Sequence, residues 1–257
     1  MNYEHMRKGI FVSRPNRFIA HVLVSGDGGK EETVICHVKN TGRCRELLIP
    51  GVTVLVQFHP EAEVLGRKTQ YSLIGVWKER ENGPLLINMD SQAPNQAAHE
   101  WLLSNSQNIS LPFHKSATKE SGIGLTIKNI KREVTYDHSR FDLAFQSVDP
   151  EFSAFMEVKG VTLEEHGLAM FPDAPTERGI KHIEELIHAH QEGYEAYLLF
   201  VIQMKEMTSF EPNRVTHPEF AAALKEAHKA GVHLLAYDCM VTEDSMVLDQ
   251  PVPVHLH

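Results

Sequence analysis

Short apolar runs separated by turn-forming residues occupy the first 90 positions of the chain. ETVICHV (32–38), GVTVLVQF (51–58), YSLIGVW (71–77) and PLLINMD (84–90) each have the length and composition of a β-strand, and the glycine-rich GDGGK (26–30) marks a turn. About five strands at this spacing predict a small barrel or sandwich, and a five-stranded Greek-key barrel of the OB type is an economical arrangement of them.

The periodicity changes after Asp90. SQAPNQAAHEWLLSN (91–105) predicts a helix, LTIKNIKREVTY (125–136) a strand, and FDLAFQSVDPEFSAFMEVKG (141–160) an apolar hairpin. A helical stripe from Ile180 to Ile187, the apolar run AYLLFVIQM, the helix FAAALKEAHKAG and the strand VHLLAYDCMV follow. Because strands alternating with helices imply parallel crossovers, we expect an all-β domain over residues 1–85 and an α/β domain with a mixed sheet over residues 86–257.

Composition excludes several classes of protein. A hydrophobic content of 42% is that of a globular chain with its own core. The charged start MNYEHMRKGIF lacks the apolar centre of a secretory signal, and no run reaches membrane-spanning length. The three cysteines form no C-x-x-C pair, so reduced, structural thiols are expected. We therefore expect a cytoplasmic protein without a membrane partner, and no feature indicates an oligomeric state.

The charge is distributed unevenly. The net charge of −9 argues against a general nucleic-acid binder, yet residues 1–80 carry 12 Lys and Arg against 8 Asp and Glu, a balance of +4, which leaves −13 for the remainder. Cations mixed with aromatic rings suit a groove for nucleic acid. The alternative, rings in the barrel core and arginines that only solubilise its outside, stays open. The candidate contacts in this part are Arg14, Arg17, Lys39, Arg43 and Arg45.

Histidine is frequent, with 16 residues, and His182, His188 and His190 fall on one predicted helix. Their spacing does not match H-E-x-x-H, the pattern of a helical zinc site. A solvated helix face is the favoured interpretation, and a zinc site is the alternative.

The predicted hairpin carries charged residues among its apolar ones. Glu157 and Lys159 are two apart on one strand and share a face, and a suitable register brings Asp142 of the other strand beside them. Two adjacent carboxylates require a cation or a proton between them, and oxygen ligands suit Mg²⁺ or Mn²⁺. Asp142 and Glu157 are therefore candidate metal ligands, and Lys159 is a candidate for orienting a water or stabilising a phosphoryl charge. A salt-bridged edge hairpin is the competing interpretation.

The helix that follows begins at an anion-binding position. Asp173 or Thr176 can cap its start, and the free amide groups there favour a phosphate. Arg178, Lys181 and His182 lie within one or two turns of that start and are candidate phosphate contacts.

The pattern of an aspartate separated by a hairpin from Glu-x-Lys resembles the signature of the PD-(D/E)-x-K nuclease superfamily. Further motifs, NTGRC (40–44), SRFD (139–142), EVKGVTL (157–163), FPDAPTERGIKH (171–182) and LLFVIQ (198–203), resemble those of the sugar fermentation stimulation protein A family over nearly the whole chain. The resemblance implies an OB-like domain, a nuclease-like domain, DNA binding without sequence preference, and regulation of sugar catabolism, particularly of maltose. It assigns the superfamily's metal carboxylates to Asp142 and Glu157 and its lysine to Lys159.

Further residues are candidates for the same site. Many of these nucleases supply another acid from an earlier element, for which Glu133 and Glu100 are both open, and Gln203 ends an apolar strand that could reach the site.

Three functions are compatible with the sequence. The first is a DNA-binding regulator with a metal-dependent nuclease-like site. The second is an active Mg²⁺-dependent nuclease acting on DNA or RNA. The third is carbohydrate or metabolite binding on the barrel, which the positive charge of residues 1–80 disfavours.

Overall fold

The computed structural model describes residues 1–26, 29–40, 42, 44–114, 124–137 and 139–257, which fold into two compact units. Unit 1 comprises Met1–Ala93, Gln203–Glu206 and Cys239–Val247. Unit 2 comprises Pro94–Ile202, Met207–Asp238 and Leu248–His257. The division into domains at residue 85 stays a prediction.

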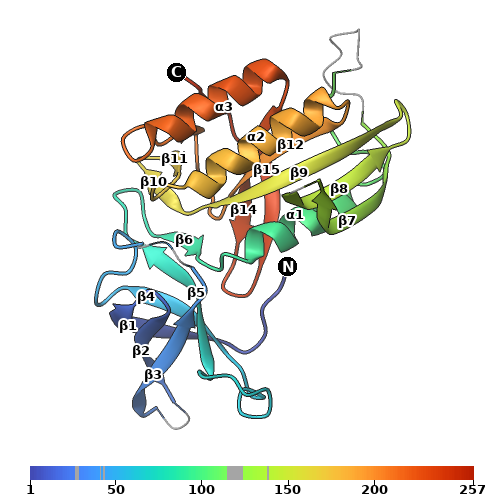
Figure 1. Cartoon of the computed structure of the whole chain (residues 1–257). Helices are drawn as coiled ribbons and strands as arrows, with labels where there is room; N and C mark the ends of the chain where they lie inside the picture. Colours follow the sequence, from blue (N-terminus) through green and yellow to red (C-terminus); the bar gives the residue numbers. More distant parts are fainter. Residues whose placement is uncertain (27–28, 41, 43, 115–123, 138) are drawn as a thin grey trace. The chain divides into compact units, whose positions relative to one another are not determined.

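Unit 1 is built around a closed barrel (Figure 1). Its strands in the described residues are β1 (Met6–Asn16), β2 (Ile19–Ser25), β3 (Glu31–Val38), β4 (Thr53–Phe58), β5 (Tyr71–Lys78) and β6 (Leu85–Asn88). Neighbouring strands run antiparallel in the order β3-β2-β1-β4-β5-β6, and a parallel pairing of β3 with β5, at Cys36 and Tyr71, closes the first five into the barrel. The predicted all-β barrel is confirmed.

Strand alternation sets the barrel core. On β2, Ala20, Val22 and Val24 are buried while the residues between them are partly exposed. Gly9 of β1 lies directly against β2. A Cβ atom at this position would be 2.5 Å from Val22 Cγ1 and 2.8 Å from Leu23 O. The close approach of β1 to β2 therefore requires glycine at this position.

Unit 2 holds a mixed sheet with helices packed on it (Figure 1). The elements that lie wholly or mostly in it are α1 (Ala93–Ser104), β7 (Ile127–Tyr136), β8 (Ser139–Ser147), β9 (Phe152–Val161), β10 (Leu163–Glu165), β11 (Leu168–Phe171), α2 (Glu177–Gln191), β12 (Glu195–Ile202), β13 (Ser209–Pro212), α3 (Pro218–Ala230), β14 (His233–Val241) and β15 (Met246–Pro251). Among the described residues the large sheet has the order β15-β14-β12-β9-β8-β7, and β10, β11 and β13 form a small one.

The large sheet is antiparallel at one edge and parallel in the middle. β7, β8 and β9 pair antiparallel, whereas β12 runs parallel to both β9 and β14. This is the mixed sheet that the sequence predicts. Every residue of β12 is buried, as its uninterrupted apolar sequence indicates.

Helices α2 and α3 pack against each other, and α2 also packs on β9 and β12 (Figure 1). Thr176 caps α2, its Oγ1 accepting a hydrogen bond from the Gly179 amide at 3.0 Å. α1 contacts β14 through Trp101, whose ring centroid lies 5.0 Å from that of Tyr237. None of the helices formed by the described residues has the length and apolarity of a membrane span. Cys36, Cys44 and Cys239 are buried, and none of the three is in a disulfide bond with another described residue.

Candidate functional site

The β8–β9 hairpin brings the predicted carboxylates together. Its register pairs Leu143 with Met156, so Asp142 and Glu157 come next along the two strands. Asp142 Oδ2 accepts a hydrogen bond from the Val158 amide of β9 at 2.8 Å, which ties the aspartate to the strand that carries Glu157 and Lys159.

Asp142 accepts a second hydrogen bond, and its surroundings disfavour its ionised form. Its Oδ1 accepts a hydrogen bond of 2.6 Å from Nδ2 of Asn95 on α1. Burial, reinforced by the nearby charge of Glu157, raises the pKa of Asp142, although the Val158 amide, Lys159 and Asn95 act in the opposite direction. The site therefore favours a proton or another cation next to this carboxylate.

Glu157 is almost completely buried, with 2% of its surface exposed, and it is paired. Oε1 accepts a hydrogen bond from Lys159 Nζ at 2.7 Å and also contacts His182 Nδ1 of α2. Burial alone would raise the pKa of Glu157, but the hydrogen bonds from His182 and Lys159 outweigh it and lower the pKa. The surroundings therefore favour the ionised form of Glu157 and disfavour the ionised form of Asp142.

One oxygen of this buried carboxylate has no partner. Glu157 Oε2 is shielded from solvent and makes no hydrogen bond to any described residue. A buried oxygen left unsatisfied is unfavourable unless water or an ion occupies the space beside it. Together with Asp142 it offers the carboxylate oxygens that Mg²⁺ and Mn²⁺ prefer, so the residues present fit the expected ion.

Helix α2 supplies the remaining neighbours. Arg178 Nε donates to His182 Nε2 at 3.2 Å, so the proton of the neutral imidazole lies on Nδ1, facing Glu157. Lys181 instead turns to the surface, where its Nζ lies 3.6 Å from Glu185 Oε1. Of the three predicted phosphate contacts on this helix, His182 contacts Glu157 directly, Arg178 contacts His182, and Lys181 pairs with Glu185. Thr176 serves as the helix cap.

The two candidates for a further acid lie in different surroundings. Glu133 is exposed on β7 and its Oε1 lies 2.8 Å from Arg140 Nη2. Glu100 Oε1 accepts a hydrogen bond from Gln96 Nε2 one turn earlier on α1, at 2.6 Å. The described contacts connect neither carboxylate to Asp142 or Glu157. The residue of α1 that does touch the site is Asn95.

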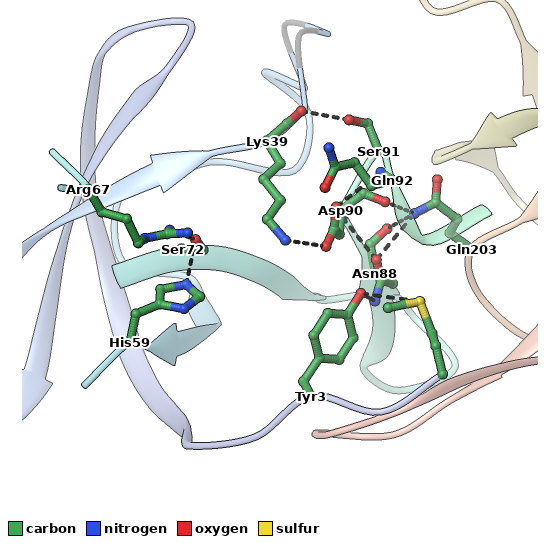
Figure 2. Close-up of polar contacts among 11 residues, drawn as sticks. Tyr3, Lys39, His59, Arg67, Ser72, Asn88, Asp90, Ser91, Gln92 and Gln203 are labelled. Carbon is green, nitrogen blue, oxygen red and sulfur yellow. Dashed lines mark hydrogen bonds and ion pairs between the residues drawn. The ribbon is translucent and has the colours of Figure 1, made fainter. Parts of the chain in front are cut away.

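Two other predicted residues belong to a polar cluster of unit 1, shown in Figure 2. Lys39 Nζ lies 2.7 Å from Oδ2 of Asp90, a carboxylate that is only 2% exposed. Gln203 Nε2 donates to the backbone oxygens of Asn88, at 2.9 Å, and Asp90, at 3.2 Å. Lys39 therefore ties the residues after β3, and Gln203 ties the segment 203–206, to the end of β6, and the polar groups of both side chains are engaged there.

The arginines of unit 1 fall into two groups. Arg14 Nη2 donates to the backbone oxygens of Arg17 and Asn40, so it supports two loops of the barrel. The guanidinium of Arg17 lies 4.7 Å from the centre of the Phe18 ring, and Arg45 is exposed. Arg43 lies outside the described residues. Arg17 and Arg45 are thus the arginines of the predicted set placed for a surface contact.

Two features of the site are not evident from the sequence. Asn95 is an ordinary helix residue in sequence, and only the packing of α1 aims it at Asp142. His182 was expected to contact phosphate, whereas it is a partner of Glu157. The spacing between Glu157 and His182 carries no signal, because β9 and α2 meet only in the folded chain.

Comparisons with known proteins agree with this architecture. Residues 12–86 match a family model described as the SfsA N-terminal OB domain, and residues 92–245 match one described as the sugar fermentation stimulation protein RE domain. A sugar fermentation stimulation protein homologue from Desulfitobacterium hafniense (strain DSM 10664 / DCB-2) is 52% identical over 256 residues, covering 100% of this chain and 99% of the relative.

More distant proteins extend the likeness. A homologue of the same description from Ruminiclostridium cellulolyticum is 47% identical, with 100% of both chains covered. The structure of Pyrococcus furiosus SfsA in complex with Ca²⁺ superposes with a TM-score of 0.76 at 26% identity, covering 99% of this chain and 98% of that one. The fold and its two-part organisation are thus shared over the full length.

Proposed function

The chain belongs to the sugar fermentation stimulation protein (SfsA) family, with an N-terminal OB domain and a nuclease-like RE domain, and from this premise we propose that it binds DNA without sequence preference and cleaves phosphodiester bonds. The reaction is assigned to Asp142, Glu157 and Lys159, with Mg²⁺ or Mn²⁺. The observation that carries the proposal is the unpartnered, buried Oε2 of Glu157 beside Asp142.

Asp142 and Glu157 would hold the ion, because their oxygens are the hard donors available at the hairpin. When bound, the ion polarises a phosphodiester and lowers the pKa of a water molecule. Asn95 and the Val158 amide fix the orientation of Asp142, each by one hydrogen bond. The aspartate is therefore presented in one geometry before any ligand arrives.

Lys159 supplies the positive charge of the site. Its Nζ lies 2.7 Å from Glu157 Oε1 and 3.2 Å from His182 Nδ1, with 14% of its side chain exposed. An ammonium group in this position can donate a hydrogen bond to a water or to a phosphoryl oxygen. Arg178 holds the His182 ring, and His182 keeps Glu157 ionised.

Unit 1 is the proposed DNA-binding surface. Residues 1–80 carry a balance of +4 in a chain of net charge −9, which suits a polyanion better than a neutral sugar. Arg17 over Phe18 provides a cation next to a stacking ring. Contacts of this kind read the phosphate backbone and the faces of bases, so they support binding without sequence preference.

DNA binding without turnover is the second candidate. His182 Nδ1 and Lys159 Nζ both contact Oε1 of Glu157, so the lysine already has an anionic partner, and a lysine engaged in this way is less available to act on a water molecule. The proposed biological role, regulation of sugar catabolism and of maltose use in particular, rests on the family. It is tested by growth of a deletion strain on maltose, complemented with the wild-type gene or with Lys159→Ala.

The deciding experiment is a cleavage assay on labelled single-stranded, duplex and branched DNA and on RNA, with Mg²⁺ or Mn²⁺. Lys159→Ala is compared with Lys131→Ala, a control at an exposed lysine of β7. Cleavage that is lost in the first variant and kept in the second supports the nuclease. Binding without cleavage, equal in wild type and both variants, supports the second candidate, and no binding under any condition contradicts the proposal.

A further inference from the structure

A second cluster of ionisable side chains lies in unit 2, away from Asp142 and Glu157. Glu195 begins β12, His233 begins β14, His190 is in the last turn of α2, and His114 precedes the segment 115–123, which is outside the described residues. Glu195 pairs with Ala154 of β9, five residues before Lys159, a separation of about 16 Å at ~3.3 Å per residue. The cluster is therefore separate from the nuclease-like site.

Glu195 organises the cluster. It is 5% exposed, and its Oε2 lies 2.8 Å from His114 Nδ1 and 2.8 Å from His233 Nε2, while Oε1 accepts a hydrogen bond of 3.0 Å from the His114 amide. A carboxylate accepts hydrogen bonds and does not donate them, so His114 carries its proton on Nδ1. The Nε2 atom of a neutral His114 is then left with a free lone pair.

His190 is fixed in the same way. Its Nδ1 lies 3.0 Å from the carbonyl oxygen of Tyr194, which can only accept, so Nδ1 is the protonated nitrogen, and Nε2 keeps a lone pair that no described residue engages in a hydrogen bond. A ring whose Nδ1–H donates to a carboxylate or a backbone carbonyl, leaving Nε2 free, is the arrangement found in metal-binding histidines.

The two free nitrogens face the same space beside Gly231. A Cβ built on Gly231 would lie 2.4 Å from His190 Nε2 and 3.2 Å from His114 Nε2, and the two rings are 4.6 Å apart. Gly231 ends α3 with a positive φ of 103°, and no side chain fills the position. His114 and Gly231 also line a cavity of about 500 Å³, together with His228 and His233.

We propose that the Nε2 atoms of His114 and His190 bind a transition-metal ion of the zinc class, with Glu195 orienting His114 and the cavity leaving room for solvent or a further ligand. Imidazole nitrogens suit Zn²⁺, Cu²⁺ and Ni²⁺, whereas Mg²⁺ and Ca²⁺ prefer oxygen, so this ion differs from the one expected at Glu157. The site is independent of the proposed DNA function.

The sequence favoured a solvated helix face for the histidines of α2, with zinc as the alternative. The structure divides them: His188 is exposed, His182 contacts Glu157, and His190 turns to His114. The pattern H-E-x-x-H describes ligands on a single helix. It does not detect this cluster, because the residues of the cluster come from α2, β12, β14 and the segment before residue 115.

The test uses the full-length, tag-free protein, stripped with a chelator and kept in excess Mg²⁺ so that the carboxylate site is not available to zinc. Glu211, His255 and His257 form another group of potential ligands, so all proteins carry His255→Gln and His257→Gln. Zn²⁺ binding is followed by calorimetric titration and by the Tm. We expect zinc to bind and to raise the Tm, with no such shift from added Ca²⁺.

The variants separate the site from its surroundings. His190→Gln should abolish the zinc-induced Tm shift. Glu195→Gln should weaken zinc binding about 10–100-fold, because the His114 ring loses its orientation. His188→Gln, on the same helix as His190, should change neither the Tm shift nor the zinc affinity. Zinc affinity that is equal in the parent and in His190→Gln would overturn the proposal.

A pair of glycine variants tests the same space without removing a ligand. Gly193 and Gly231 each follow a helix with a positive φ, but a Cβ on Gly193 meets nothing within 4 Å. Gly193→Ala and Gly231→Ala therefore share the backbone strain, and only Gly231→Ala should lose zinc binding. Equal zinc binding in the two alanine variants would also contradict the site.

Discussion

At the scale of single residues, the two carboxylates of the hairpin differ because their partners differ. Glu157 faces Lys159 and His182, which lower its pKa against the effect of burial. Asp142 is partly buried and lies near the charge of Glu157, and the donors around it do not compensate, so its pKa is raised. The sequence alone places both as equivalent acids, and only their surroundings distinguish them.

Asp142→Asn should therefore stabilise the metal-free protein. Because the folded pKa is raised, the favourable contribution of Asp142 is present below its ordinary pKa of 3.8 and is lost as pH rises through the folded value, so at neutral pH its charge is destabilising. An asparagine keeps the acceptor for the Val158 amide, and a rotated Asn95 amide can accept from its NH₂ group. We expect a higher Tm at pH 7, about 2–4 °C for each kcal/mol gained, and loss of stabilisation by Mg²⁺.

Glu184→Gln, at an exposed carboxylate of α2, is the control for the removal of a negative charge. The gain from Asp142→Asn should disappear when the unfolding is repeated at acidic pH, where Asp142 itself is protonated. A Tm below that of the wild type at pH 7 would show that the charge of Asp142 is favourable in the folded state.

The thiol of Cys36 should be unreactive in the native barrel. Burial raises its pKa to about 12, and its side chain is 0% exposed. We expect no alkylation by iodoacetamide up to about pH 9 and rapid alkylation in denaturant, followed by mass spectrometry of the tryptic peptides. Because the folded pKa is raised, the stability that depends on the neutral thiol is lost as pH rises from the ordinary pKa of 9 through 12. Modification of Cys36 under native conditions at pH 8 would contradict its burial.

At the scale of elements, helix α2 connects separate parts of unit 2. Thr176 caps its start, His182 contacts the hairpin from its second turn, and His190 lies in its last turn, in the histidine cluster. Its position matters for both proposed sites, because β9 and β12 pack beneath it.

Thr176→Ala should destabilise the protein by about 1 kcal/mol, since the Gly179 amide loses its side-chain acceptor. For a chain of this size the Tm should fall by about 2–4 °C. Thr176→Ser keeps the hydroxyl and should leave the helix cap intact in the same thermal unfolding experiment. If serine and alanine lower the Tm equally, the methyl group that packs against Gly179, and not the cap, carries the effect.

At the scale of the whole molecule, charge is divided between the first 80 residues and the rest, at +4 and −13. A polyanion that binds this chain is attracted by the first part and repelled by the second, so binding should depend strongly on salt.

The double variant Arg17→Ala and Arg45→Ala should weaken DNA binding equally on unrelated sequences. If each arginine neutralises one phosphate, the slope of log K against log salt should become less steep by about 1.4–1.8. Fluorescence anisotropy over a range of salt concentrations measures this, with Lys30→Ala, at an exposed lysine directly before β3, as the control. A slope equal to that of the wild type would remove these arginines from the contact surface.

Much of the fold was predictable because it follows from local patterns. The alternation at Ala20, Val22 and Val24 predicts a strand with one buried face, and the unbroken apolar sequence of β12 predicts a strand buried on both. The apolar arms and the turn predict the hairpin, whereas its register, which places Asp142 next to Glu157, is known only from the folded sheet. Polar contacts between distant segments were not predictable. The contacts of Lys39 with Asp90 and of Gln203 with Asn88 depend on how segments that are far apart in the sequence come together in the fold.

Local patterns in the sequence were enough to predict the main strands and helices, the family, and the residue types of the candidate site, because periodicity and motifs are properties of neighbouring positions. The roles of Asn95 and His182 in the site, and the approach of His114 and His190 to the same space beside Gly231, depend on the folded chain. Hydrogen bonds and the contacts that shift a pKa act over a few ångströms. Residues that are far apart in sequence come within that distance only when the chain has folded.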